Sequence, residues 1–334
     1  MHSIIRPSTT MFGTSKDVAK SLPAHVAVMG CTGAGKTTFI NLASNSDLRV
    51  GVGLESCTDA IQMSKTFILD DMEVTLVDTP GFDDTSKSDA EILNIVCDFL
   101  SSEYHHGRRL HGVIYLHRIS DNRMAGSAMR NLRFFRQLCG DDALTNCAVV
   151  TSMWDSVSPQ VGAEREEELK SKENFFKPIL DSGATLFRHD NTIESTHQII
   201  RPLIHKAPIA LAIQRELVDE GKRVFETSAG NTLLGEIAAL EKKHQEELQR
   251  LEVEMAEVME QHDEETQREI EEAKQELLET QHRLEQERER ILNATSTAKR
   301  QTKSNSFFHF LRLFFRPFWC CIRNPTRKED HDIV

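Results

Sequence analysis

The sequence predicts an α/β fold, a doubly wound and mostly parallel sheet with helices on both faces, followed by a long C-terminal helix or coiled coil. Three observations support this. From His25 onward, apolar runs of strand length alternate with amphipathic stretches of helix length. A glycine-rich segment joins the first apolar run to the first helical stretch. Between Gly235 and Pro317 there is no further glycine or proline, and Glu, Gln, Leu, Lys and Arg dominate.

The individual elements follow from this alternation. Strands are expected at residues 25–30, 61–69, 74–80, 112–119, 146–153 and 184–190, and helices after Gly35, Ser88, Met124, Gly162 and Asn191. Because only a hairpin-sized connection joins the second and third runs, these two strands should be antiparallel. We expect a disordered arm over residues 1–24, a folded domain over 25–207 and a helical connector over 208–234. The first 24 residues contain no apolar run of signal-peptide length, so we do not expect secretion.

Charge is unevenly distributed along the chain. Residues 236–292 contain 19 acidic and 8 basic side chains, whereas residues 293–334 contain 8 basic and 3 acidic ones, within a total of −12. An acidic total argues against nucleic acid as a partner, because phosphate binding needs a basic face on a folded domain. The 7 cysteines form no CxxC pair and no zinc-ligand spacing, which fits a reducing compartment.

The acidic segment predicts one long helix with a coiled-coil seam over residues 235–292. Its apolar or tolerated positions alternate between spacings of three and four, with a stutter near Thr266. The seam consists of Ile237, Leu240, His244, Leu248, Leu251, Met255, Val258, His262, Ile270, Ala273, Leu277, Leu284 and Ile291. Such a helix, about 80 Å long, has no other segment in the chain to pack against, which favours self-association. The alternative is a solvated, highly charged single helix.

A phosphate-binding loop is predicted at residues 30–37, which read GCTGAGKT and match GxxxxGK[ST] between a strand and a helix. Glycines let backbone N–H groups close around phosphate oxygens, Lys36 meets the β- and γ-phosphates, and Thr37 is a ligand of Mg²⁺. The predicted phosphate-binding residues are Gly30, Cys31, Thr32, Gly33, Ala34, Gly35, Lys36, Thr37 and Thr38.

A second motif, DTPG at residues 78–81, follows the third apolar run. Asp78 can hold a magnesium-bound water, and Gly81 can offer its N–H to a γ-phosphate, as in the sensing element of GTPase switches. The alternative is an ordinary strand-to-turn sequence. Thr58 ends a glycine-rich stretch between the two motifs and is the third candidate magnesium ligand. The candidate catalytic residues are Lys36, Thr58 and Gly81.

The motifs GCTGAGKTTFIN, ESCT, LVDTPGFDD and VIYLHRISD resemble the septin-related branch of GTPases, which includes the AIG1-type proteins and the chloroplast import receptors. More closely, the run from His25 to about Gly221, continuing into an acidic coiled coil, resembles fungal AIG1-like G-domain proteins. The resemblance implies a P-loop GTPase G domain that binds GTP or GDP with Mg²⁺. It also implies dimerisation across the nucleotide face.

The base-recognition motif departs from the NKxD pattern of many GTPases. Residues 151–155 read TSMWD, so the aspartate comes one place late if Thr151 takes the Asn position. Asp155 could pair with the guanine N1 and N2 hydrogens, while Trp154 could stack on the base or be a buried strand-end aromatic. His189 and Asn191 are further base-contacting candidates, or part of a helix cap. Selectivity for GTP over ATP is therefore less secure than phosphate binding.

The residue after DTPG bears on turnover. Many active GTPases place a water-orienting Gln there, and this chain has Phe82. A phenyl ring neither donates a hydrogen bond to the attacking water nor accepts one, so we expect slow hydrolysis that depends on a partner or a second subunit. Arg118, Arg123 and Arg130 could serve a dimer face or be solvated surface arginines.

The tail, residues 293–334, is basic and rich in phenylalanine. Residues 306–322 are too short and too interrupted by charge to span a bilayer, but their polar positions fall on one stripe of a helix. We expect this segment to lie in an anionic membrane interface, with Cys320 and Cys321 as possible palmitate acceptors. The alternative is a tail that packs on the rest of the protein.

Together these observations favour a cytoplasmic GTP-binding protein, peripheral on the cytosolic face of a membrane, that hydrolyses GTP slowly and acts as a switch or scaffold. We expect a homodimer or homo-oligomer formed through the G domain, the coiled coil or both. The alternatives are a coiled-coil scaffold that holds nucleotide without hydrolysis and, less favoured, an ATP-dependent P-loop enzyme.

Overall fold

The computed structural model describes residues 23–50, 60–82, 87–122, 124, 126–261 and 264–294. The predictions on residues 1–22, on Thr58, on Arg123, on His262 and on the tail from residue 295 fall outside this part of the chain. The chain divides into two compact units, one within Met1–Ile92 and Arg108–Ala212 and the other within Leu93–Gly107 and Ile213–Val334. Each unit is described separately below.

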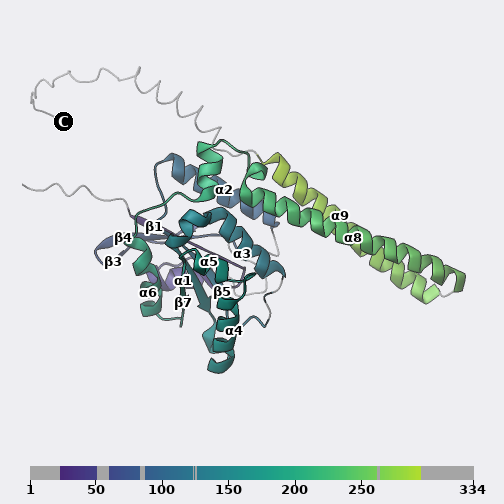
Figure 1. The fold of residues 1–334 in the computed structure, drawn as a ribbon, viewed down its shortest axis with the longest axis horizontal. Coiled ribbons are helices and arrows are strands. Elements are labelled where there is room, and N and C mark those ends of the chain that lie inside the picture. Colours follow the sequence, from purple (N-terminus) through teal and green to yellow (C-terminus); the bar gives the residue numbers. More distant parts are fainter. Residues whose placement is uncertain are drawn as a thin grey trace, which may run out of the picture. The chain divides into compact units, whose positions relative to one another are not determined.

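The first unit is built on a mostly parallel sheet of seven strands, as the sequence predicts (Figure 1). The strands are β1 (Ala24–Gly30), β2 (Gln62–Met63), β3 (Phe67–Leu69), β4 (Met72–Asp78), β5 (Gly112–Arg118), β6 (Cys147–Ser152) and β7 (Thr185–Arg188). Their order is β2-β4-β1-β5-β6-β7, with β3 paired to β4. The pairs β1–β4, β1–β5, β5–β6 and β6–β7 are parallel, whereas β2 and β3 run antiparallel to β4. The predicted hairpin is therefore confirmed, although its first run forms two short strands.

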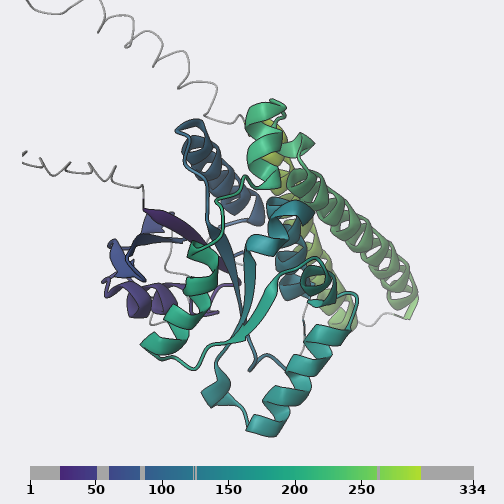
Figure 2. The same cartoon turned by 60° about the vertical axis from the view of Figure 1, so that its left-hand side comes forward.

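Helices cover both faces of this sheet because the central strands are apolar on both sides. On one face, α1 (Lys36–Ser44) and α6 (Ile193–Ile204) lie side by side and pack on Val26 and Val28 of β1 (Figures 1 and 2). On the other face, Tyr115 of β5 meets Phe135 of α3 (Gly126–Cys139), with ring centroids 5.0 Å apart. The P-loop follows β1 and so lies at the carboxyl edge of this sheet, where ligands of open α/β sheets bind.

The remaining helical elements of the first unit include η1 (Asp141–Asn146), η2 (Trp154–Ser156), α4 (Pro159–Ser171) and α5 (Lys177–Asp181). The predicted helix after Gly162 begins earlier, at Pro159. The reason is local: Ser158 accepts a hydrogen bond from the backbone N–H of Val161, and proline is well suited to the first helical position. Helix α2 (Asp89–His105) contributes residues to both units.

The second unit is helical. It contains η3 (Arg215–Asp219), η4 (Val224–Glu226), α8 (Ser228–Gln261) and α9 (Glu264–Asn293), and α7 (Ala212–Gln214) lies at its boundary. None of the helices among the described residues is both long and apolar enough to cross a membrane.

The prediction of one long helix without an internal partner is wrong. Helices α8 and α9 form an antiparallel hairpin, with ion pairs Lys274–Glu252 at 3.9 Å and Arg288–Glu241 at 3.6 Å (Figure 2). Of the predicted seam positions in α9, Ile270, Leu284 and Ile291 are buried, whereas Ala273 is exposed. An apolar stripe can be covered within one chain or by a second chain, and its spacing does not distinguish the two.

Candidate nucleotide-binding site

The loop that joins β1 to α1 has a backbone suited to phosphate. A Cβ on Gly30 would lie 2.3 Å from the carbonyl oxygen of Leu116, so only glycine fits there. Gly35 has φ 92° and caps α1 without a side-chain hydrogen bond. The first N–H groups of α1 therefore face the loop at the positive end of the helix dipole.

The DTPG segment lies directly against this loop. Lys36 is 6% exposed, and its ammonium donates to the carbonyl oxygens of Gly30 and Cys31, each at 3.0 Å. A Cβ on Gly81 would lie 2.8 Å from Lys36 Nζ and 2.6 Å from the backbone nitrogen of Thr32. The Thr32 N–H donates to the carbonyl oxygen of Phe82 at 3.2 Å. Glycine at position 81 thus permits the close approach of the two motifs at the lysine.

Asp78 and Thr37 form a polar pair at the end of β4. Asp78 Oδ2 accepts a hydrogen bond from Thr37 Oγ1 at 2.7 Å, whereas Oδ1 is buried and has no hydrogen-bond partner among the residues that the structure describes. Burial raises the pKa of Asp78, and the Thr37 hydrogen bond and the Lys36 charge oppose this increase. A buried carboxylate oxygen without a partner beside a threonine hydroxyl fits a bound divalent cation or one of its waters.

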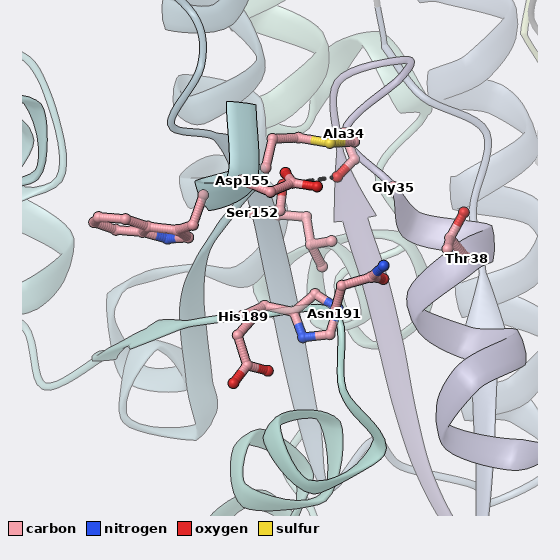
Figure 3. Close-up of a pocket in the computed structure, with 11 residues that line it drawn as sticks. Ala34, Gly35, Thr38, Ser152, Asp155, His189 and Asn191 are labelled. Atoms are coloured by element: carbon pink, nitrogen blue, oxygen red, sulfur yellow. Dashed lines mark hydrogen bonds between the residues drawn. The ribbon is translucent and has the colours of Figure 1, made fainter. Parts of the chain in front are cut away.

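A cavity of about 400 Å³ adjoins the P-loop (Figure 3). It is lined by Ala34, Gly35, Thr38, Leu116, Ser152, Met153, Trp154, Asp155, His189, Asp190 and Asn191. The structure thus brings the P-loop together with the ends of β6 and β7. Figure 3 shows Asp155 and Asn191 entering this space from two different loops. Parallel strands place their carboxyl ends at one edge, which explains why segments more than 100 residues apart meet here.

Thr151 is not among the lining residues. It is fully buried, and its carbonyl oxygen and Oγ1 accept the indole N–H of Trp154 at 3.2 and 3.0 Å. The sequence offered Thr151 as a candidate base-contacting residue, on the condition that it takes the Asn position of NKxD. The chain instead turns at Met153, which has φ 61°, so the residues after it form the pocket wall. A methionine with a left-handed backbone conformation is uncommon, and no sequence signal indicates this conformation.

Sequence reasoning missed Ser152, Met153, Asp190 and Leu116 in the lining. Ser152 Oγ donates to the carbonyl oxygen of Ala34 at 3.0 Å and so ties β6 to the P-loop (Figure 3). Asp190 accepts from the backbone N–H of Thr192 at 3.2 Å and from its hydroxyl at 2.6 Å. A polar strand end was the only available signal for Asp190.

His189 is a buried, packed ring. Its Nδ1 lies 2.7 Å from Ser195 Oγ, and its ring meets Phe39 edge-on with centroids 5.1 Å apart. Burial lowers the pKa of His189, so the neutral imidazole is favoured at neutral pH.

Phe82 is an internal side chain. It is 4% exposed, and its ring stacks on Phe134 of α3 with centroids 5.2 Å apart and planes 11° apart. Arg118 lies at the other side of the P-loop, where its Nη1 is 3.2 Å from the position of a Cβ on Gly33, and it pairs with Asp121 at 3.0 Å.

Comparison with known proteins agrees with this geometry. Residues 25–127 match the model of the 50S ribosome-binding GTPase family. GTP-binding protein A of Dictyostelium discoideum is 27% identical over 136 residues, which cover 40% of this chain and 29% of that protein. This chain therefore spans less than a third of the length of that curated relative.

Two solved structures are also similar. Toc33 from Arabidopsis thaliana, in complex with GDP and Mg²⁺, is 16% identical, and the match covers 56% of this chain and 88% of that chain with a TM-score of 0.43. The elongation factor SelB from Methanococcus maripaludis, in complex with a GTP analogue, is 16% identical over 56% of this chain and 35% of that chain, with a TM-score of 0.37. The family match over residues 25–127, the P-loop motif and the mostly parallel sheet together give the folded region that begins at residue 25 the architecture typical of P-loop GTPases.

Proposed function

We propose that this chain binds GTP or GDP together with Mg²⁺ and hydrolyses GTP slowly. One observation supports this most directly: the P-loop, the β6 end and the β7 end line a single cavity. Lys36 is the cation for the β- and γ-phosphates, and the N–H groups of the P-loop and of Gly81 surround the phosphate oxygens.

Thr37 and Asp78 are proposed to hold the magnesium ion, with Thr58 as a third ligand. The unpartnered Oδ1 of Asp78 supports this assignment. When bound, Mg²⁺ neutralises charge that develops on the phosphates. The chain's own contribution is to orient Thr37 against Asp78 and to keep Lys36 beside both.

We propose that Asp155 recognises the guanine base. Two carboxylates line the cavity, but Asp190 is already occupied by the Thr192 hydroxyl and N–H. Asp155 is exposed, and its Oδ1 accepts a hydrogen bond from the neighbouring Ser156 hydroxyl at 3.3 Å. A free carboxylate edge can accept the N1 and N2 hydrogens of guanine, whereas adenine offers no such donor pair.

The burial of Phe82 supports slow hydrolysis of GTP. Its ring packs on Phe134, so the position that often orients the attacking water is filled by a core side chain. We propose that a second subunit or a partner completes the site. The alternative is a scaffold that holds nucleotide without turnover, and the same buried ring favours it.

The test of binding is calorimetry on Lys36→Ala, which we expect to lower GTP affinity at least about tenfold, because the point charge on the phosphates is lost. Lys172→Ala, which removes an exposed ion pair with Glu168, is the control. Unchanged GTP affinity in Lys36→Ala would overturn the site, and equal competition by ATP and GTP would overturn guanine selectivity.

The rate of GTP hydrolysis distinguishes a GTPase switch from a scaffold that holds nucleotide without hydrolysis. Single-turnover hydrolysis should be slow in dilute protein and should accelerate as protein concentration rises. A fast rate independent of concentration would contradict dimer-assisted hydrolysis. No hydrolysis at any concentration would favour the scaffold.

We further propose that the chain is an AIG1-like, septin-related GTPase whose basic tail binds the cytosolic face of a membrane. The sequence supports membrane binding by the tail, with six phenylalanines and Trp319 between positions 307 and 319 and with 8 basic and no acidic residues from 291 to 328. The full chain should co-float with phosphatidylserine vesicles, less so at high salt, and replacement of Cys320 and Cys321 by serine should shorten membrane residence in cells. A chain that stays unbound at low salt would refute the membrane role.

A further inference from the structure

Trp154 is covered by a guanidinium. The Arg188 Cζ lies 4.3 Å from the centroid of the Trp154 ring, within cation–π range. Arg188 is itself fixed by Glu166 of α4, to which its Nε donates at 3.0 Å and its Nη2 at 2.6 Å. Glu166 is only 8% exposed, so this ion pair is held at the protein surface by a largely buried carboxylate.

The indole is held at two further points. Its N–H donates to the carbonyl oxygen and hydroxyl of Thr151. Its six-membered ring packs on Gly162 of α4, where a Cβ would lie 2.7 Å from Cζ3. The ring is therefore already in contact with Arg188, Gly162 and Thr151, and these contacts restrain it from turning to stack on a base.

The position of this cluster in the chain links it to the cavity. Trp154 stands between Met153 and Asp155, and Arg188 directly precedes His189, and all of these neighbours line the cavity. One cation–π contact therefore joins the β6 loop to the β7 loop. Residues Glu166, Arg188, Trp154 and Gly162 are called the tryptophan clamp below.

We propose that the tryptophan clamp is the positioning element that sets guanine specificity, because it holds Asp155 at a fixed place relative to the β7 loop. This inference rests on the proposed function, since it deepens the role of the same cavity. Trp154 is then a positioning residue and not a stacking platform. Arginine suits the task better than lysine, because only the planar guanidinium can lie on a ring and bind a carboxylate with two nitrogens at once.

The test uses the full chain in a Trp319→Phe background, which leaves Trp154 as the only tryptophan and therefore as a fluorescent reporter. Arg188→Ala and Arg188→Lys remove or weaken the clamp. Arg223→Ala is the matched control, because Arg223 lies 4.1 Å over Phe225 and pairs with Glu226 at 2.9 Å in the helical unit. Affinities for GTP and ATP and acrylamide quenching of Trp154 are measured for each protein.

We expect Arg188→Ala to lower GTP affinity about tenfold, which corresponds to about 1.4 kcal/mol, and to leave ATP affinity within about twofold. Quenching of Trp154 should increase. Arg188→Lys should resemble Arg188→Ala, and Arg223→Ala should resemble the parent. Gly162→Ala should also lower the GTP-to-ATP affinity ratio, because its Cβ displaces the indole.

Three results would overturn the proposal: increased quenching with an unchanged GTP-to-ATP ratio, equal losses for both nucleotides, or unchanged quenching in Arg188→Ala. Failure of the proposed function is distinguishable. A parent protein that binds GTP and ATP alike would refute guanine selectivity and the role of the clamp in it, while the quenching measurement would still report whether Arg188 covers Trp154.

Discussion

The variant Phe82→Gln tests which of two expectations holds at position 82, the one from the sequence pattern of GTPases or the one from the packing in this structure. By pattern alone, glutamine after DTPG should restore a water-orienting group and raise GTP hydrolysis. By geometry, the side chain at position 82 lies in the core against Phe134 and not at the phosphates. We therefore expect no increase in hydrolysis and a clear loss of stability.

The size of the loss follows from three contributions. The ring is 4% exposed, so its removal forfeits about 1.5–3 kcal/mol of burial. The stacked pair with Phe134 adds about 0.5–1.5 kcal/mol. An amide left in an apolar site costs about 1–3 kcal/mol more unless it finds a partner. We expect the free energy of unfolding to fall by about 4 kcal/mol.

Urea denaturation measures this loss. With a slope of about 2 kcal/mol per molar, the midpoint should fall by about 2 M. Phe82→Leu is the matched control, because it keeps an apolar side chain of similar size and should cost only about 1 kcal/mol. A glutamine variant as stable as the parent, with faster GTP hydrolysis, would show that position 82 faces the nucleotide and would refute this reasoning.

Three further predictions concern pH and packing. Burial raises the pKa of Asp78 above its ordinary value of 3.8. The protonated Asp78 carboxyl therefore contributes stability below pH 3.8, and this contribution is lost as the pH rises through the pKa of the folded protein. Asp78→Asn should therefore raise stability without Mg²⁺ at pH 7 by about 1 kcal/mol, measured in urea, and should abolish magnesium-dependent nucleotide affinity; lower stability would contradict this. Burial lowers the pKa of His117 from 6.5 to about 4, so stability should fall by up to about 3 kcal/mol as pH drops across that range, and His117→Phe should flatten the slope. Ile291→Ala, at a fully buried position, should destabilise the helical hairpin by about 3 kcal/mol, and the change in helical melting by circular dichroism should not depend on protein concentration if α8 and α9 pair within one chain.

Local patterns were sufficient for the sheet and the P-loop. The apolar run at residues 25–30 and the GxxxxGK[ST] spacing each specify their own backbone, so β1 and the start of α1 fall where the sequence predicts them. The hairpin of β3 and β4 was predictable for the same reason, since its connection is short.

Contacts between distant segments were not predictable. The packing of Arg188 on Trp154 depends on the register of β6 with β7, in which Thr151 pairs with Arg188. The turn at Met153, which moves Thr151 out of the cavity lining, is a single backbone angle. Whether the apolar stripe of a helix is covered by the same chain depends on where that helix ends. The residues near Thr266 include no glycine or proline that would mark such an end.

The return of α9 along α8 determines where Ala294 lies relative to the start of α8. Along one continuous helix, residue 294 would lie some 90 Å from residue 235 at about 1.5 Å per residue. In the hairpin, Arg288 reaches back to Glu241, and α9 contacts the η4 turn that precedes α8. Ala294 therefore lies at the end of the hairpin where α8 begins, and Gln261 and Glu264 lie at the opposite end. Partners bound at these two ends would be separated by the length of the hairpin, so both ends could be engaged at the same time.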